Sequence, residues 1–322
     1  MTFDAERFST ISRVTSLFGG SIQTLEPEHG TTLVTSINEL LSKSLNRLNN
    51  SSGKPGGIVA VPDHLDPVIV GDLHGNVDNL LTILCIHNVF ERLEKGTAAL
   101  IFLGDAVHSE EPGTLAFMDS SLLMMDLIFI LMLQYPHQVT YLMGNHDSFS
   151  EEIIKDGVPQ GVLWEKHLTS RRGEFYRDQM QQFYQLSPLL AQSSQFLACH
   201  AGPPRESVSL AKMIDIASFP KLANDLVWSR VRSPAHPLGY THRDVRRFQK
   251  SMSVKPAIPF VVGHSPLSDG ATYWENIGQI PNHHLVYSAH QHQVGVFTRI
   301  SDSMQGSVSP TIPMLAQVNQ SA

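Results

Sequence analysis

The sequence contains little cysteine, with only Cys85 and Cys199 among its 322 residues. Both lie in apolar stretches, and two thiols are too few for a disulfide framework or a thiolate zinc site. We therefore expect a reducing compartment, with the cytoplasm as the default location and secretion as a bacterial effector as the open alternative. Cys199 directly precedes His200 and is expected to be a buried strand residue, not a nucleophile.

Basic residues are also scarce, with 23 Lys and Arg against 30 Asp and Glu, which gives a formal net charge of −7. This balance argues against general binding to nucleic acids or to anionic membranes, because either would favour a concentrated basic surface. Any anionic substrate must therefore meet a local positive feature.

Long hydrophobic runs are absent as well. The most apolar stretch, residues 122–133, is too short to cross a bilayer and contains Asp126, so we expect a buried helix and no transmembrane segment. The N-terminus has an early acidic residue and no uninterrupted apolar core, so no signal peptide is predicted.

Strand patterns are weak in the first 57 residues. Apolar residues at near-helical spacing predict one amphipathic helix over residues 37–50. The turn formers at 49–57 then indicate a boundary. We therefore expect an N-terminal helical appendage (1–57), a main domain (58–300) and a flexible tail rich in Ser and Gln (301–322), either end of which could dock a partner.

The main domain alternates short apolar runs with helical patterns. The runs and the polar residues after them are VIVGDLHGN (68–76), AALIFLGD (98–105), VTYLMGNHD (139–147), QFLACHAG (195–202), PFVVGHS (259–265) and HLVYSAH (284–290). Short buried strands that alternate with helices indicate a layered α/β fold in which both faces of a sheet are covered. Polar groups in such folds collect at the carboxyl ends of strands.

Five of these strand ends carry side chains that can bind metal. They are Asp72 and His74, Asp105, Asn145 and His146, His200, and His264. One such pair could be a capped turn, but five repeats of the pattern are not expected by chance. Carboxylate, imidazole and amide ligands suit Mn, Fe or Zn, and we expect two divalent ions, most often Mn.

Two ions need one bridging ligand, and Asp105 stands alone at its strand end. Two bridged ions can share a hydroxide and clamp a phosphoryl group for in-line attack, which hydrolyses phosphate esters without a protein nucleophile. His146 directly follows Asn145, so the two side chains diverge in a turn, and an imidazole suits a general acid near neutral pH.

In order and spacing, GDLHGN, LGDAVH, GNHD, CHAG and VGHS resemble the metallophosphoesterase superfamily. They are most similar to the PPP-type serine/threonine phosphatases and their bacterial and phage relatives, as are residues 183–206 and DLVWSR (225–230). The resemblance implies a calcineurin-like fold, with two packed mixed β-sheets flanked by helices. It assigns Asp72 and His74 to the first metal, Asp105 to the bridge, Asn145, His200 and His264 to the second metal, and His146 to the general acid.

The second motif departs from that family, where it normally ends in Asp-Arg-Gly. Here the three positions are His108, Ser109 and Glu110. By resemblance, the missing aspartate would orient the general-acid histidine and the missing arginine would hold the substrate phosphate. His108 could replace the hydrogen bond to His146, contact the phosphate, or be a polar loop residue.

Another cation must then hold the phosphate. The resemblance favours Arg230, with Arg232 and Arg243 as alternatives, whereas Arg171 and Arg172 are expected on an exposed face. The candidate catalytic residues are His146, Asp105 and Arg230, and the candidate phosphate or substrate contacts are Arg230, Asn145, His108, Arg232 and His290. His283, His284 and His292 are expected to be polar loop or strand-face residues.

The sequence therefore predicts a bimetallic phosphomonoester hydrolase. We expect a serine/threonine protein phosphatase, with phosphotyrosine as a further possible substrate and a phosphoprotein as the partner. Two alternatives stay open at this point: a dinucleoside-polyphosphate or nucleotide hydrolase, and a phosphate-binding scaffold that kept its metals and lost turnover.

Overall fold

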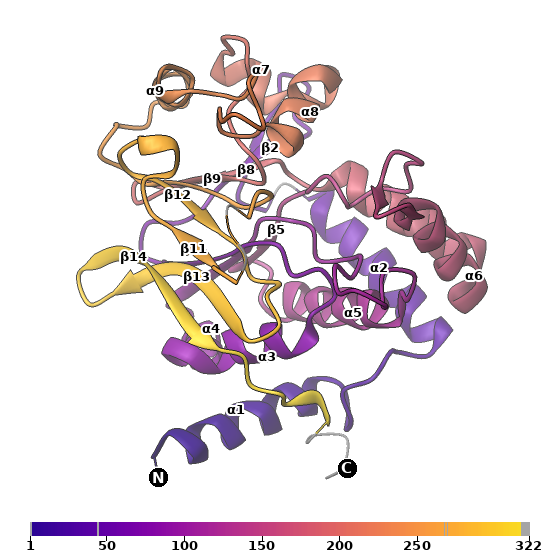
Figure 1. Ribbon diagram of the computed structural model, residues 1–322. Coiled ribbons are helices and arrows are strands. Elements are labelled where there is room, and N and C mark those ends of the chain that lie inside the picture. The colour runs from indigo at the N-terminus through magenta and orange to yellow at the C-terminus, as the bar shows by residue number, and fades with distance from the viewer. Residues whose placement is uncertain (1, 44, 267, 269, 317–322) are drawn as a thin grey trace.

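Two β-sheets packed face to face form the centre of the molecule (Figure 1). The computed structural model of the chain describes residues 2–43, 45–266, 268 and 270–316. Within these residues one sheet has five strands, in the order β14 (Ser303–Pro310), β13 (Gln293–Ile300), β3 (Asp66–Val70), β4 (Ala98–Phe102) and β5 (Val139–Tyr141). The other has seven, in the order β1 (Arg47–Asn49), β2 (Pro55–Ala60), β8 (Leu190–Gln192), β9 (Leu197–Cys199), β10 (Phe260–Val262), β12 (His283–Val286) and β11 (Tyr273–Trp274).

Helices cover the outer face of each sheet. Over the five-stranded sheet lie α2 (Pro27–Leu41), α3 (Val77–Cys85), α4 (Val89–Glu94), α5 (Asp119–Gln134) and α6 (Gln160–Leu186), with α1 (Thr2–Leu17) outside them. Over the seven-stranded sheet lie α7 (Leu210–Ile214), α8 (Pro220–Trp228) and α9 (His242–Ser251). The predicted arrangement of two mixed sheets flanked by helices is confirmed.

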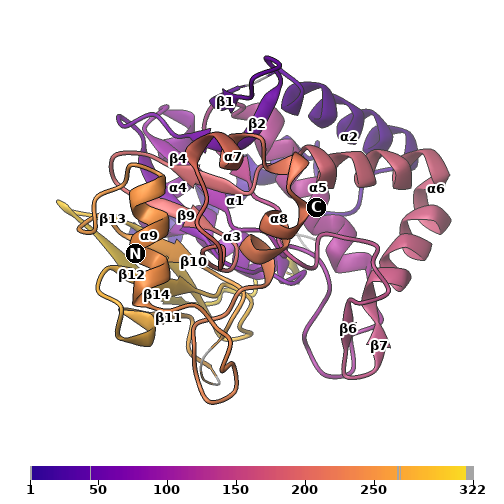
Figure 2. The same ribbon diagram turned by 90° about the horizontal axis from the view of Figure 1, so that it is seen from above.

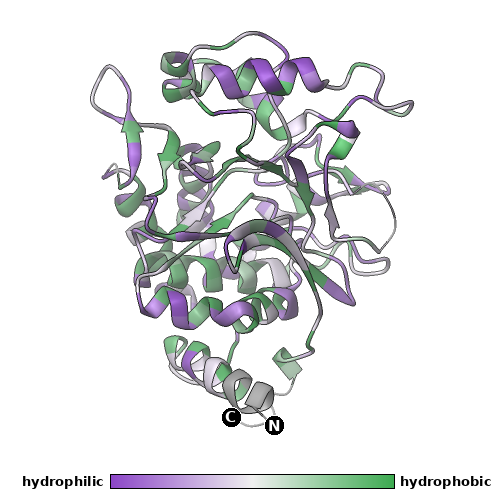
Figure 3. Ribbon diagram, turned by 90° about the vertical axis from the view of Figure 1, so that its left-hand side faces the viewer, coloured by the Kyte–Doolittle hydropathy of each residue, from purple (hydrophilic) through white to green (hydrophobic). Residues whose placement is uncertain are grey.

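Strand alternation explains how the layers pack. Val68 and Val70 of β3 point into the cluster shared with the helices, whereas Ile69 between them points into the cluster between the sheets. In β4, Leu100 and Ile101 divide in the same way, because successive strand residues face opposite sides. Figure 3 shows hydrophobic residues, in green, on strands and helices at the centre of the molecule.

Parallel strands bring their carboxyl ends to the same edge. Strands β3, β4 and β5 run parallel in one sheet, and β9, β10 and β12 run parallel in the other. Residues 71–74 and 103–105 therefore lie side by side, and the backbone nitrogens of Leu73 and His74 both donate to the Asp105 carbonyl at 3.0 Å. The described helices include none that is both long and apolar enough to cross a membrane.

The N-terminal segment differs from the predicted appendage. Helix α2 ends at Leu41, and residues 47–49 form β1 instead of continuing a helix to residue 50. The turn formers after residue 49 make a hairpin between β1 and β2, and β2 crosses the expected boundary at residue 57 to join the seven-stranded sheet. The same turn-forming residues occur in hairpins and in linkers. Here β2 pairs with β8, and this long-range contact makes the segment a hairpin within the sheet.

The C-terminal segment also differs from the predicted flexible tail. Strand β14 pairs with β13 over its whole length, and Met314 is fully buried. Asp78 at the start of α3 accepts hydrogen bonds from the backbone nitrogens of Met314, at 2.8 Å, and Leu315, at 2.7 Å. The polar Ser and Gln side chains give no apolar strand pattern in the sequence, because this strand is stabilised by backbone hydrogen bonds to its neighbour. Residues 317–322 of the expected tail lie outside the described residues.

A buried ion pair connects the N-terminal segment to the helix layer, and it corrects the exposed position expected for Arg172. The Arg172 guanidinium donates to both carboxylate oxygens of Asp126 in α5, at 2.7 and 2.5 Å. Arg172 also donates to the Leu25 carbonyl, and Asp126 accepts from the Leu25 nitrogen. Both side chains are almost completely buried, whereas Arg171 is 58% exposed, as expected for an outer face.

We predict that Asp126→Ala destabilises the protein by about 3–5 kcal/mol, because it leaves the Arg172 charge buried without its partner. Urea unfolding measures the change. The matched control is Asp119→Ala, which removes the exposed pair with Arg171 and should cost no more than about 1 kcal/mol. Equal losses in the two variants would contradict the prediction.

Candidate metal centre

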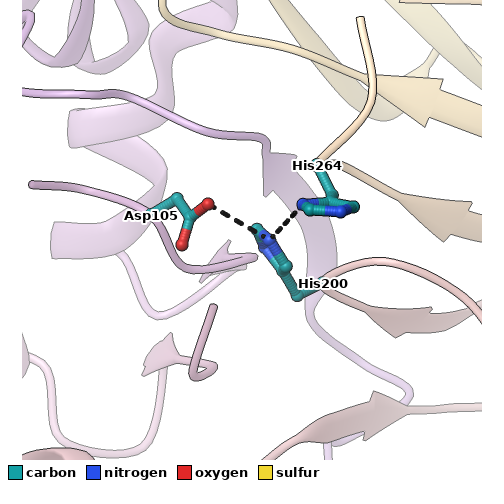
Figure 4. A group of neighbouring side chains, drawn as sticks. All are labelled: Asp105, His200 and His264. Carbon is teal, nitrogen blue, oxygen red and sulfur yellow. Dashed lines mark hydrogen bonds and ion pairs between the residues drawn. The ribbon is translucent and has the colours of Figure 1, made fainter. Parts of the chain in front are cut away.

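Two groups of ligands meet where the two sheets adjoin. Asp72, His74 and Asp105 form the first group, and Asp105, His200 and His264 form the second; in each group the ligand atoms lie within 4.8 Å of one another, and all five residues are buried. Asp105 belongs to both groups, which is the position predicted for a bridging ligand. Figure 4 shows the second group, in which His200 lies between Asp105 and His264.

Backbone hydrogen bonds orient the two carboxylates. One oxygen of Asp72 accepts from the His264 nitrogen at 2.8 Å, and one oxygen of Asp105 accepts from the His146 nitrogen at 2.7 Å. The second oxygen of Asp72 lies 3.6 Å from Nε2 of His74, and that of Asp105 lies 3.2 Å from Nε2 of His200. Each carboxylate thus keeps one oxygen for a metal.

The histidine rings are oriented by backbone carbonyls. Nδ1 of His74 lies 3.1 Å from the Val107 carbonyl and 3.0 Å from the His108 carbonyl, and Nδ1 of His200 lies 2.9 Å from the Leu103 carbonyl. With the proton on Nδ1, Nε2 of each ring is free to bind a metal. The carbonyl contacts therefore select the tautomer that ligation needs.

Asn145, a further candidate ligand, lies beside the second group. Its side-chain oxygen lies 3.0 Å from Nε2 of His200, which is itself 3.3 Å from Nδ1 of His264. Amide oxygen, carboxylate oxygen and two imidazole nitrogens therefore converge on one point. This donor set without thiolate fits a borderline divalent ion.

Several of the candidate ligands have an uncommon backbone conformation. His74, Asp105 and His264 have φ values of 45°, 51° and 69°, in the left-handed region that non-glycine residues rarely adopt. Such residues cost on the order of 1–3 kcal/mol each and cluster at functional sites. Space is equally tight, because a Cβ atom on Gly144 would overlap the Asp105 carboxylate and one on Gly263 would overlap that of Asp72.

Asp147 holds this backbone in place, a role that sequence reasoning missed. Its carboxyl accepts from the nitrogens of Asp105, at 3.1 Å, and Gly144, at 2.8 Å, and from the Tyr141 hydroxyl, at 2.7 Å. Burial raises the pKa of Asp147 to about 7. The sequence signal for Asp147 was its place as the last residue of GNHD, directly after Asn145 and His146.

Electrostatics favour bound cations at this centre. Burial alone would lower the pKa of His74, but Glu110, Asp72 and Asp105 outweigh it and raise that pKa to about 10. Burial would also lower the pKa of His200, and Asp105 and Asp72 raise it to about 9. The buried carboxylates therefore retain protons on the imidazoles when no metal is bound, and divalent ions would replace that positive charge.

His108 occupies the position expected for a partner of His146. Their Nδ1 atoms lie 3.2 Å apart, so one ring donates and the other accepts. Burial lowers the pKa of His146 and also that of His108. This contact is one of the three arrangements that the sequence left open for His108. A neutral imidazole stabilises a neighbouring imidazolium less than a carboxylate does, so the contact does not reproduce the electrostatics of an aspartate.

A pocket of about 300 Å³ opens over both ligand groups. Besides the ligands, its lining includes His146, Glu110, Lys155, Trp228, Arg230 and Tyr287. Arg230 donates to the Ser265 hydroxyl at 2.7 Å, and burial lowers its pKa. Of the three arginines considered as phosphate contacts, Arg230 is the one that lines the pocket.

The other predicted contacts lie elsewhere. Arg232 is exposed and donates to the Pro237 carbonyl, and Arg243 is exposed on α9. His290 is half-buried, outside the residues that line the pocket, and its carbonyl accepts from the Asn79 amide. His108 lies behind His146 and does not line the pocket either.

Glu110 and Lys155 are pocket residues that the sequence reasoning did not assign. A Glu110 oxygen lies 3.8 Å from Nε2 of His74 and 2.7 Å from Nζ of Lys155, and the Tyr287 hydroxyl donates to the other oxygen. Burial would raise the pKa of Glu110, but His74, Lys155 and Tyr287 lower it to about 2, so it stays ionised. Glu110 stood in the altered motif, whereas nothing in the sequence pointed to Lys155.

The histidines near the last strands and Cys199 lie outside the pocket. His283 and His284 are buried in β12, and each pairs with a tyrosine hydroxyl, at 2.9 and 2.8 Å. His292 is exposed beside β13. Cys199 is fully buried in β9, where burial raises its pKa, which is unfavourable for a nucleophile.

Known proteins share this fold. The family model described as calcineurin-like phosphoesterase matches residues 67–294. A serine/threonine phosphatase from Saccharomyces cerevisiae with similarity to human phosphatase PP5 superposes with a TM-score of 0.64 at 16% identity, over 89% of this chain and 91% of that one. A cold-active protein-tyrosine phosphatase from a psychrophilic Shewanella species gives 0.51 at 13% identity, over 80% and 82%. These likenesses concern the fold. A search of curated proteins found no match.

We predict that metal binding releases protons and strengthens as the pH rises from about 6 to about 8. His74 and His200 must lose protons before Nε2 can ligate, and their raised pKa values keep them protonated across this range. Calorimetric titration with Mn²⁺ in buffers of different ionisation enthalpy counts the protons. His74→Gln should release fewer. Affinity that is independent of pH in both proteins would refute the prediction.

Proposed function

We propose that this chain, which belongs to the calcineurin-like phosphoesterase family, is a metal-dependent phosphomonoester hydrolase that acts on phosphoproteins. The observation that carries the proposal is the pair of buried ligand groups that share Asp105 and open into a pocket containing Arg230. The donor set suits Mn²⁺ first, with Fe or Zn as alternatives.

The residues have separate roles in this reaction. Two divalent ions bound here would supply Lewis acidity and an activated water. The Arg230 guanidinium holds the phosphate oxygens, because its planar donors match their geometry and charge. His146 lines the pocket next to Asn145 and delivers a proton to the leaving oxygen.

Phosphoserine and phosphothreonine are the proposed substrates, and phosphotyrosine is a further one. The similar structures bear the names of a serine/threonine phosphatase and a tyrosine phosphatase, and both are protein phosphatases. The two substrate types differ in leaving group. A tyrosine phenolate, with a parent pKa of about 10, leaves with less help from a general acid than a serine alkoxide does.

We predict that the Mn²⁺-loaded protein hydrolyses p-nitrophenyl phosphate and phosphopeptides and that Asp105→Asn lowers kcat/KM by about 100-fold or more. The change removes the charge shared by both ligand groups. Cys199→Ala is the control, since a buried core thiol is not needed for a metal-dependent reaction, and it should retain activity. Release of phosphate is the measurement.

The same assay includes a diadenosine polyphosphate. Preference for that compound over every phosphopeptide would favour a nucleotide hydrolase. Full metal content without hydrolysis of any substrate would contradict the proposed activity and would favour a phosphate-binding scaffold. Loss of activity in Cys199→Ala with retention in Asp105→Asn would indicate a different chemistry altogether.

We predict that His108→Asp raises kcat for phosphoserine peptides by about tenfold near neutral pH, because a carboxylate beside His146 stabilises the imidazolium and raises its pKa. The rate on p-nitrophenyl phosphate should change less, since p-nitrophenolate leaves without a proton. The ratio of the two kcat values is the measurement. His108→Ala is the companion variant, and near-normal kcat on both substrates in that variant would show that His108 is a passive loop residue.

A further inference from the structure

A short hairpin before α6 reaches the pocket. Strands β6 (Ile154–Lys155) and β7 (Val158–Pro159) are joined by Asp156 and Gly157, whose φ values of 47° and 79° fit the type I′ turn that Asp-Gly favours. Figure 2 shows the hairpin projecting near one end of α6. Because the turn is tight, Lys155 has a defined position at the end of its strand.

A buried glutamine connects this hairpin to the altered second motif. Gln160, the first residue of α6, is fully buried, and its amide donates to the carbonyls of Ser109, at 2.7 Å, and Leu115, at 3.0 Å. Ser109 stands where the resembled family has an arginine, and its hydroxyl bonds to Thr114 at 2.7 Å. The serine is thus engaged within its own loop, while the hairpin is fixed beside it.

Lys155 supplies a positive charge at this wall of the pocket. Its ammonium contacts Glu110 at 2.7 Å, and its side chain is 38% exposed and lines the pocket. An ammonium has three donors, so after the bond to Glu110 it can still donate two. Arg230 comes from the segment after α8, so the two cations reach the pocket from different elements.

Charge balance makes this lysine important for an anionic ligand. Glu110 lines the same pocket as a carboxylate, which would repel a phosphate dianion. Lys155 neutralises that carboxylate and adds donors beside it. We propose that Lys155 binds the substrate phosphate together with Arg230 and replaces the cation missing at position 109. This inference rests on the proposed function, because it names a further substrate contact of the same site.

The competing explanation is that the ion pair only fastens the hairpin to the loop. A fastening role would affect stability and leave phosphate affinity unchanged, whereas a binding role would affect phosphate affinity and leave metal content and Tm nearly unchanged. A second competing explanation is that Lys155 acts only by cancelling the charge of Glu110. A double-mutant cycle with Glu110 separates that effect from direct contact.

The test uses the Mn²⁺-loaded full chain and two readouts: the Kd of inorganic phosphate by calorimetry, and KM and kcat with p-nitrophenyl phosphate. Lys155→Met should weaken phosphate binding and raise KM by about tenfold, with little change in kcat, because one charge-assisted contact is lost at a partly exposed site. Lys155→Arg should recover most of the affinity. Lys221→Met is the matched control, because Lys221 forms a similar pair with Glu206 on an exposed surface. This variant should bind phosphate as tightly as the unmodified protein does.

The double variant Glu110→Gln with Lys155→Met completes the cycle. If Lys155 contacts phosphate, the double variant stays about tenfold weaker than Glu110→Gln alone. Equal phosphate affinity in those two proteins would overturn the proposal, as would equal affinity in Lys155→Met and Lys221→Met.

Calorimetry separates this proposal from the proposed function. Phosphate binding that depends on Lys155 in a protein without turnover would support the contact and refute the hydrolase. Absence of both phosphate binding and turnover in the unmodified protein would overturn both.

Discussion

The structure depends on buried negative charge placed where the two sheets meet. Asp72 and Asp105 extend from neighbouring parallel strands, and each carboxylate accepts a backbone hydrogen bond from another strand end, at His264 and His146. The Asp72 contact reaches from one sheet to the other, so formation of the ligand set and packing of the sheets require each other. Carboxylates this deeply buried need positive charge, which protons on the imidazoles or divalent ions provide.

The candidate metal ligands follow the motif pattern noted in the sequence, whereas the second motif differs from that pattern after Asp105. Asp105 keeps its place in the pattern, and its backbone nitrogen donates to the Asp147 carboxylate. Three residues further on, His108 contacts His146, and Glu110 adds a carboxylate to the pocket. Glu110 also acts on a candidate ligand, because its charge helps to raise the pKa of His74. Under the proposed function, these changes alter how a leaving group receives its proton and how a phosphate is held.

Segments distant from the pocket support the sheet layer that carries it. The Arg172–Asp126 pair joins Leu25 to two helices, and β14 covers the edge of β13, which would otherwise present unpaired backbone groups. The chain ends outside the family match at 67–294 are therefore packed parts of the fold over the described residues. The C-terminal segment is connected to the site through β13, which pairs with β3, the strand that precedes Asp72.

The sequence by itself determined the layered fold and the candidate ligands, because strand alternation and polar residues after apolar runs are local patterns. Asp72, His74, Asp105, Asn145, His200 and His264 were all predicted, and the structure brings them together. Only the tertiary structure decided that β2 and β14 join the sheets, that Arg172 is buried, and that Lys155 from a distant hairpin faces Glu110. Those outcomes depend on contacts between segments far apart in the chain. The free energy of such contacts is set by the partner residue and by burial, which local composition does not show.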